Sequence, residues 1–324
     1  MPIPFLMLPP QSDKTREWAK TVAEACPELE VILPETREGA EQAIALAEGA
    51  FGTIPKEMLP RADHLRWLQA PQAAPPAGYY YPELIAHPVQ ITNFREIYND
   101  HIAAHIMSFV LAFARGLHVY IPQQLRSEWK PSGSESDDIV VHLPEATALI
   151  VGVGGIGAEA ARLAAAFGMK VIGIDERRPD KPAGVAEMHR AAALDTLLPQ
   201  ADFVILTVPH TPETEGFFNR ARFQRMKKSA FFINIGRGMT TKLGDLVAAL
   251  EAKEIAGAAL DVYEIEPLPA THPLWTMPNV LLTPHTAGHG PYLDDRRRDV
   301  LVDNAKRFVA GQPLRNVVDK ARWF

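Results

Sequence analysis

Hydrophobic positions in the first part of the chain form short runs that alternate with amphipathic stretches. A run of about four to eight apolar residues indicates a strand, whereas apolar residues every three or four positions indicate a helix. By these criteria two helices are predicted, at Thr15–Ala25 and Gly39–Glu48. The predicted strands are Ile3–Met7, Val31–Leu33, Phe51–Gly52, Leu65–Gln69 and Val89–Asn93. Such alternation of strands and helices predicts an open, parallel α/β sheet.

A second alternating series follows a long apolar helix, predicted at Asp100–Leu117, and a loop at Lys130–Asp138. Its strand candidates are uniformly apolar, which is typical of parallel strands buried on both faces. They are Ala146–Val151, Val171–Ile174, Phe203–Val208, Ala230–Ile235, Ala256–Val262 and Val280–Thr283. A last helix is predicted at Asp294–Val309, after the second series has ended. The pattern therefore predicts two doubly wound domains, one formed by residues 1–98 and 290–324 and the other by residues 99–289.

Composition narrows the class of protein. With 47% hydrophobic and 22% charged residues, the chain has the composition of a globular protein. The net charge is −6 and no Lys/Arg-rich run occurs, so no nucleic-acid partner is expected. No apolar run is long enough to cross a bilayer, and the N-terminus lacks the charged start of a signal peptide. Cys26 is the only cysteine, which fits a reducing compartment. We therefore expect a cytoplasmic protein without a membrane partner.

A glycine-rich turn lies between the strand candidate Ala146–Val151 and a helix predicted at Ala158–Phe167. Its residues are Gly152, Val153, Gly154, Gly155, Ile156 and Gly157. In this context the first glycine permits a tight turn, the second lets the backbone approach a pyrophosphate, and the last lets the helix pack on the strand. The free N–H groups of the helix N-terminus favour an anion. The turn therefore predicts a dinucleotide site, to which Gly152, Gly154, Gly155, Ile156 and Gly157 contribute.

The identity of the dinucleotide depends on Asp175, at the end of the next predicted strand. An acid at this place accepts hydrogen bonds from the ribose hydroxyls, which favours NAD. Arg177 and Arg178 follow directly, and a guanidinium there could accommodate the 2′-phosphate of NADP. NAD is the predicted cofactor, with NADP as the alternative.

Chemically capable side chains follow three consecutive strand candidates of the second series. Arg237 lies between Gly236 and Gly238, Glu266 follows an acid-rich segment, and His285 ends the last strand. A guanidinium suits capture of a carboxylate, and a histidine beside an acid suits proton transfer. Taken singly, each is equally well explained by a structural salt bridge or a core histidine; a common strand edge favours catalysis. No metal site is expected, because His101 and His105 have no accompanying carboxylate cluster.

At this point the sequence resembles the D-isomer-specific 2-hydroxyacid dehydrogenase family. The resemblance is carried by several phrases in the family's order and spacing: Leu206-Thr207-Val208-Pro209, Thr211-Pro212-Glu213-Thr214, Arg225-Met226-Lys227, Gly236-Arg237-Gly238, Asp261-Val262-Tyr263-Glu264 and Pro284-His285. It implies an α/β fold in which a Rossmann dinucleotide-binding domain is inserted into a flavodoxin-like substrate domain. It also implies that Arg237 binds substrate, that His285 is the acid/base, that Glu266 orients the imidazole, and that Asp261 approaches the nicotinamide. The remaining implied cofactor contacts are Val208, Pro209, Ile235, Gly236, Arg237 and His285.

The loop Ala70–Pro76 departs from the Ser/Gly-rich loop that the family usually carries. The resemblance makes its backbone N–H groups donors to the substrate carboxylate, together with Arg237 and His285. Because proline has no N–H, the expected donors are Gln72, Ala73 and Ala74. The departure leaves the substrate open, and we expect a small 2-hydroxy or 2-keto acid.

Three functions remain open from the sequence. The first is a D-specific oxidoreductase that transfers a hydride between NAD(H) and C2 of such an acid, as a homodimer. The second is an NAD(H)-sensing regulator or corepressor on the same fold, since fold does not determine function. The third is a phosphite-type dehydrogenase. A formate dehydrogenase is disfavoured, because such enzymes pair the histidine with an amide and this chain has Glu266.

Overall fold

The computed structural model describes residues 2–73, 78–131 and 139–322. The chain divides into two compact units, Met1–Ile97 with Pro291–Phe324, and Tyr98–Gly290. The second unit is thus an insertion in the first, at positions one residue from the boundaries that the hydrophobic pattern suggests.

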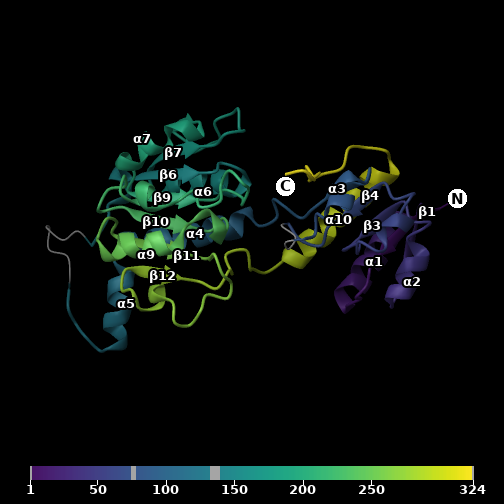
Figure 1. The fold of residues 1–324 in the computed structure, drawn as a ribbon, viewed down its shortest axis with the longest axis horizontal. Coiled ribbons are helices and arrows are strands. Elements are labelled where there is room, and N and C mark those ends of the chain that lie inside the picture. The colour runs from purple at the N-terminus through teal and green to yellow at the C-terminus, as the bar shows by residue number, and fades with distance from the viewer. Residues whose placement is uncertain (1, 74–77, 132–138, 323–324) are drawn as a thin grey trace. The chain divides into compact units, whose positions relative to one another are not determined.

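The first unit contains a five-stranded parallel sheet with strand order β2-β1-β3-β4-β5 (Figure 1). This is the strand order of flavodoxin-like folds. The strands are β1 (Ile3–Met7), β2 (Leu29–Ile32), β3 (Gly49–Phe51), β4 (Trp67–Gln69) and β5 (Gln90–Thr92). The helices are α1 (Asp13–Ala25), α2 (Arg37–Ala43), α3 (Pro82–Ala86) and α10 (Leu293–Val309). Helix α10, from the end of the chain, packs against α1.

The second unit contains a seven-stranded parallel sheet with strand order β12-β11-β10-β9-β6-β7-β8, the Rossmann order with one added strand. The strands are β6 (Thr147–Val151), β7 (Lys170–Ile174), β8 (Glu187–His189), β9 (Phe203–Leu206), β10 (Phe231–Asn234), β11 (Gly257–Leu260) and β12 (Val280–Leu282). The helices are α4 (Asn99–Ala114), α5 (Leu117–Leu125), α6 (Gly155–Ala166), α7 (Leu194–Leu197), α8 (Arg220–Phe223) and α9 (Leu243–Glu251). The predicted fold class, two parallel-sheet α/β domains, is confirmed.

Both faces of the seven-stranded sheet are covered, which explains why its strands are apolar throughout. Successive residues of β6 enter different cores: Leu149 joins one cluster, with α7, α8 and α9, and Ile150 joins another, with α4 and α6. Because side chains alternate along a strand, burial of both faces requires an uninterrupted apolar run. The uniform runs of the sequence are therefore a consequence of two helical layers.

The predicted helix Asp100–Leu117 is wrong in one respect, because the structure has two helices here. Gly116 has φ of 67°, a left-handed conformation, and separates α4 from α5. A Cβ at Gly116 would lie 2.7 Å from Cγ2 of Ile139, so the turn needs glycine. Among the described residues no single helix is long and apolar enough to cross a membrane; α4 and α5 meet that criterion only together, across a 75° bend.

Other boundaries differ for simple reasons. The predicted helix Gly39–Glu48 ends at Ala43, since β3 begins at Gly49 and the chain must turn before it. Strand β8 was not predicted, because its residues Glu187–His189 are half-buried at the edge of the sheet and two of the three are polar. An edge strand lacks the apolar signature of its buried neighbours.

Candidate active site

The loops after β6, β9 and β10 meet closely at the carboxyl edge of the seven-stranded sheet. A Cβ on Gly152 would lie 2.9 Å from Cγ1 of Val208, and a Cβ on Gly236 would lie 2.6 Å from the carbonyl oxygen of Val208. Strand β6 pairs in parallel with β7 on one side and with β9 on the other, so the order in which strands are added to the sheet reverses at β6. Ligands of open α/β sheets bind at such a point.

The glycine-rich turn has the features that a pyrophosphate requires. Gly152 has φ of 96°, and a Cβ on Gly157 would lie 2.0 Å from the carbonyl oxygen of Gly152. By contrast, a Cβ on Gly154 would meet nothing within 4 Å. Helix α6 begins after Gly154, which has no side chain to cap the first N–H groups of the helix. Open space in front of uncapped N–H groups fits the phosphates of a dinucleotide.

Asp175 lies directly after β7, beside this turn. One carboxylate oxygen accepts a hydrogen bond from N–H of Val153 at 2.8 Å, and the other accepts from N–H of Arg177 and Arg178 at 2.9 Å each. The guanidinium of Arg178 in turn donates to the carbonyl oxygen of Val153 at 2.9 Å and pairs with Asp180. Asp175 therefore braces the glycine turn itself, a role that the sequence did not suggest.

Arg237 follows β10 in a turn that Asn234 organises. The buried side chain of Asn234 accepts from N–H of Gly236 at 3.0 Å and donates to the hydroxyl of Thr241 at 2.9 Å. A Cβ on Gly238 would lie 1.8 Å from the carbonyl oxygen of Tyr263, so the turn lies directly on the loop after β11. Asn234 was not predicted as part of the site, although an amide at the end of an apolar strand is a recognisable signal.

The Arg237 guanidinium donates to the carbonyl oxygen of Gly236 at 2.6 Å. Burial lowers the pKa of Arg237 from its usual value, and the negative charge of Glu266 opposes that shift. The group stays cationic, because the ordinary pKa of a guanidinium is far above neutrality. A partly desolvated cation of this kind attracts a substrate anion more strongly than one in water.

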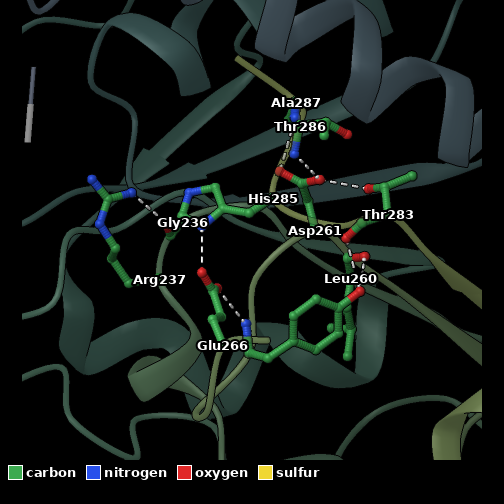
Figure 2. Close-up of polar contacts among 10 residues, drawn as sticks. Gly236, Arg237, Leu260, Asp261, Glu266, Thr283, His285, Thr286 and Ala287 are labelled. Carbon is green, nitrogen blue, oxygen red and sulfur yellow. Dashed lines mark hydrogen bonds and ion pairs between the residues drawn. The ribbon is translucent and has the colours of Figure 1, made fainter. Parts of the chain in front are cut away.

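His285 and Glu266 form the central pair of the site (Figure 2). Nδ1 of His285 lies 2.6 Å from Oε2 of Glu266, and Oε1 of Glu266 accepts from N–H of Tyr263 at 2.9 Å. Because a carboxylate only accepts, Nδ1 carries the proton of this hydrogen bond. The other ring nitrogen, Nε2, is thereby left for a ligand. Figure 2 also shows Arg237, whose guanidinium donates to the carbonyl oxygen of Gly236.

Asp261, at the end of β11, is buried with 1% exposure. Its carboxylate accepts from the hydroxyl of Thr283 at 2.6 Å and from N–H of Thr286 and Ala287 at 2.8 and 2.9 Å. These donors flank His285, whose φ of 53° places it in the left-handed region. Asp261 thus holds the turn that carries the histidine.

Glu264, which follows Asp261 in the acid-rich segment, has a structural role. Glu264 is exposed and accepts from N–H of Leu243 at 2.7 Å, so it stabilises the N-terminus of α9. Within residues 2–73, 78–131 and 139–322 there is no group of three or more His, Cys, Asp and Glu side chains that could hold a metal ion.

The loop residues expected at the substrate carboxylate, in addition to Arg237 and His285, belong to the first unit. Gln72 is exposed, Ala73 is half-buried, and Ala74 lies outside the described residues. The side chain of Asn93, which is 1% exposed, donates to the carbonyl oxygen of Ala73 at 2.9 Å. Asn93 follows β5 and fixes the start of this loop; the sequence analysis did not single it out.

The remaining predicted cofactor contacts lie at the same sheet edge of the second unit. Ile156 is in the first turn of α6, Val208 and Pro209 follow β9, and Ile235 follows β10. Pro209 is exposed, Val208 and Ile156 are half-buried, and Ile235 is buried.

Comparison with known proteins identifies relatives of the whole chain. Residues 107–287 match the sequence model of the "D-isomer specific 2-hydroxyacid dehydrogenase, NAD binding domain". Glyoxylate/hydroxypyruvate reductase B of Citrobacter koseri is 35% identical over 299 residues, covering 89% of each protein.

Solved structures superpose on nearly the whole chain. A D-isomer specific 2-hydroxyacid dehydrogenase from Xanthobacter autotrophicus Py2, in complex with NADPH and MES, superposes with a TM-score of 0.85 at 28% identity and full coverage of both chains. An NADPH-dependent glyoxylate/hydroxypyruvate reductase from Sinorhizobium meliloti, in complex with NADP and sulfate, gives a TM-score of 0.80 at 29% identity, covering 99% of this chain and 100% of that one. With its NAD-binding domain, its two parallel-sheet units and these relatives, the chain belongs to the D-isomer specific 2-hydroxyacid dehydrogenase family and is a 2-hydroxyacid oxidoreductase that uses NAD or NADP.

Proposed function

We propose that the protein reduces a small 2-keto acid, of the size of glyoxylate or hydroxypyruvate, to the D-2-hydroxy acid. The observation that carries the proposal is the 2.6 Å contact between Nδ1 of His285 and Glu266, which leaves Nε2 to donate a proton. Relatives named glyoxylate/hydroxypyruvate reductase support the substrate class.

The bound NAD(P)H supplies the hydride to C2 of the keto acid. As the carbonyl oxygen gains negative charge, His285 donates the proton from Nε2 and Glu266 stabilises the imidazolium that must be present beforehand. Arg237 binds the carboxylate and carbonyl of the substrate as a cation. The products are the hydroxy acid and the oxidised cofactor, so one hydride and one proton are consumed for each turnover.

On the side of the first unit we propose that the N–H groups of Gln72, Ala73 and Ala74 receive the substrate carboxylate. The support is chemical: the prolines of this loop cannot donate, and Asn93 holds the carbonyl oxygen of Ala73, which orients the adjoining peptide. We further propose that the side-chain amide of Gln72 adds a contact to the substrate. Gln72→Ala keeps the backbone N–H and removes this amide, so it should lower kcat/KM for all keto acids by about threefold or more, the value of one hydrogen bond. Unchanged kinetics would show that its side chain does not reach substrate.

The decisive experiment is oxidation of NADH and NADPH by the purified protein with glyoxylate, hydroxypyruvate, pyruvate and bulkier 2-keto acids, followed by absorbance. Turnover that falls with increasing substrate size is the expected result. The reverse reaction with D- and L-2-hydroxy acids tests the stereochemistry. Binding of NADH without turnover on any keto acid would favour the regulatory alternative, and reduction of NAD by phosphite would favour the phosphite-type enzyme.

We also propose that the protein is a homodimer through the segment that contains α5. None of the residues of α5 is buried, and Ile121, Leu125 and Trp129 are 49%, 82% and 93% exposed. Apolar side chains gathered on one exposed segment usually mark an interface. Light scattering should give twice the mass of the 35.7 kDa chain, and Leu125→Ser with Trp129→Ser should give the monomer mass. A wild-type protein of monomer mass would exclude the dimer.

A further inference from the structure

The turn that carries His285 belongs to no helix or strand, yet its histidine must keep a fixed direction. The carboxylate of Asp261 holds the turn in place by accepting hydrogen bonds from Thr283, Thr286 and Ala287. A charge-assisted hydrogen bond is worth about twice a neutral one, so the position of the Asp261 carboxylate determines that of the turn. What holds Asp261 in place is therefore relevant to catalysis.

The Thr283 hydroxyl links Asp261 to helix α4. A hydroxyl has one proton, and here it is donated to Oδ1 of Asp261, since an ionised carboxylate only accepts. Nε2 of His105 lies 3.0 Å from the same hydroxyl oxygen. Because the Thr283 proton is already used, Nε2 must be the donor in this second hydrogen bond. The chain of donation runs from His105 to Thr283 to Asp261.

The surroundings of His105 fix its ring as the hydrogen-bond donor to Thr283. Its ring lies edge-on to Phe109, with centroids 4.7 Å apart and an angle of 84° between the ring planes. Burial lowers the pKa of His105, and the charge of Asp261, whose Oδ1 is 3.9 Å from Nε2, partly opposes that shift. The lowered pKa favours the neutral ring, and the hydrogen bond to Thr283 places its single proton on Nε2. Helix α4, which carries His105, packs against α6 and β10 and is therefore part of the core of the second unit.

We propose that His105 and Thr283 are positioning residues for the catalytic histidine: they orient the carboxylate of Asp261, which in turn orients the turn that carries His285. The inference rests on the proposed role of His285 as proton donor. Neither residue was assigned a function from the sequence, in which His105 was considered only as a metal ligand.

Matched pairs of variants test the proposal, because one member of each pair keeps the hydrogen bond. Thr283→Ser retains a hydroxyl and Thr283→Val has nearly the same shape without one. His105→Gln retains an N–H donor and His105→Leu does not. We expect the Val and Leu variants to lower kcat by about three- to tenfold, the effect of one hydrogen bond, with an unchanged Kd for NADH. The Ser and Gln variants should retain most of the wild-type kcat.

Thr276→Val serves as a control, since Thr276 is exposed and donates only to the carbonyl oxygen of Pro273. If both members of a pair lose kcat equally, or if the Val and Leu variants retain wild-type kcat, the proposal is wrong. A loss that appears in the Kd for NADH instead would assign the network to cofactor binding.

A readout without turnover separates this inference from the proposed function. In protein with isotope-labelled histidine, the ring signal of His285, assigned with His285→Asn, should shift in Thr283→Val and keep its position in Thr283→Ser. If the wild-type protein reduces no keto acid but the signal shifts in this way, the function is wrong and the positioning network stands. An unmoved signal in both variants would overturn the network.

Discussion

Nδ1 of His285 and Oε2 of Glu266 lie 2.6 Å apart although their side chains are 49% and 36% exposed. Solvent at this exposure screens the attraction, so the pair adds little to the stability of the fold. Its value lies in orientation: one oxygen of Glu266 is held by N–H of Tyr263, and the other is thereby aimed at the imidazole.

Glu266→Gln should therefore change catalysis rather than stability. The neutral amide stabilises an imidazolium less, so the loss of keto-acid reduction with rising pH should begin at lower pH. The measurement is kcat against pH, with Glu264→Gln as the matched control, since Glu264 contacts only the N-terminus of α9 among its described partners. An identical pH profile in Glu266→Gln and wild type would remove Glu266 from the mechanism.

His285→Ala should lower kcat by about 10²–10⁴-fold, the usual contribution of general acid catalysis. The Kd for NADH should stay nearly constant. Because His285 has φ of 53°, His285→Asn is the better companion variant: asparagine tolerates this conformation, so the turn keeps its shape. Full activity of the asparagine variant would exclude His285 as the proton donor.

Two glycine-to-alanine substitutions should separate cofactor binding from folding. At Gly154 a Cβ meets nothing within 4 Å, so Gly154→Ala should fold with an unchanged Tm and raise the Kd for NADH by about tenfold or more, because the methyl group enters the space for the pyrophosphate. At Gly238 a Cβ would lie 1.8 Å from the carbonyl oxygen of Tyr263. Gly238→Ala should lower the free energy of unfolding by about 3 kcal/mol. Tight NADH binding by Gly154→Ala would contradict the location of the pyrophosphate.

Asp175→Ala should weaken NADH binding by about 1.5–3 kcal/mol, the value of a hydrogen bond to a charged group. Since Asp175 also holds N–H of Val153, part of this loss should extend to NADPH, and Asp175→Asn, which keeps an acceptor, should lose less. Fluorescence titration with both cofactors measures the effect. Wild-type preference for NADPH would overturn the assignment to NAD and point to Arg177 and Arg178.

Acid should destabilise the protein through two half-buried histidines, His105 and His118, before its carboxylates titrate. Burial lowers the pKa of His105 and His118 below the ordinary value of 6.5, so the unfolded chain binds protons more readily than the folded one. Their contribution to stability is complete above that pH and is lost as the pH falls below it. Urea unfolding at pH 7, 6 and 5 should show this decline. His118→Phe keeps a ring against Phe113 and should reduce the loss of unfolding free energy between pH 7 and pH 5. An equal loss in the variant and the wild type would show that His118 does not contribute to it.

The sequence by itself determined the order of elements and the chemistry of the second unit. Uniform apolar runs such as Ala146–Val151 predict buried parallel strands, because a strand covered on both faces has no polar side. Gly152, Gly154 and Gly157 lie at positions where backbone geometry excludes other residues or a ligand needs space, so their pattern is visible without coordinates. Where short elements are polar or lie at an edge, as in Glu187–His189, no such periodic signal exists.

Only the tertiary structure decided which partners these groups have. The pairing of His285 with Glu266, the bracing of the glycine turn by Asp175, and the network from His105 through Thr283 to Asp261 join residues up to 178 positions apart. Hydrogen bonds of this kind act over about 3 Å, and only the folding of parallel strands brings the ends of β6, β11 and β12 to one edge with helix α4 beside them. Residue type and spacing carry no information about such contacts, so the sequence did not connect His105 with His285.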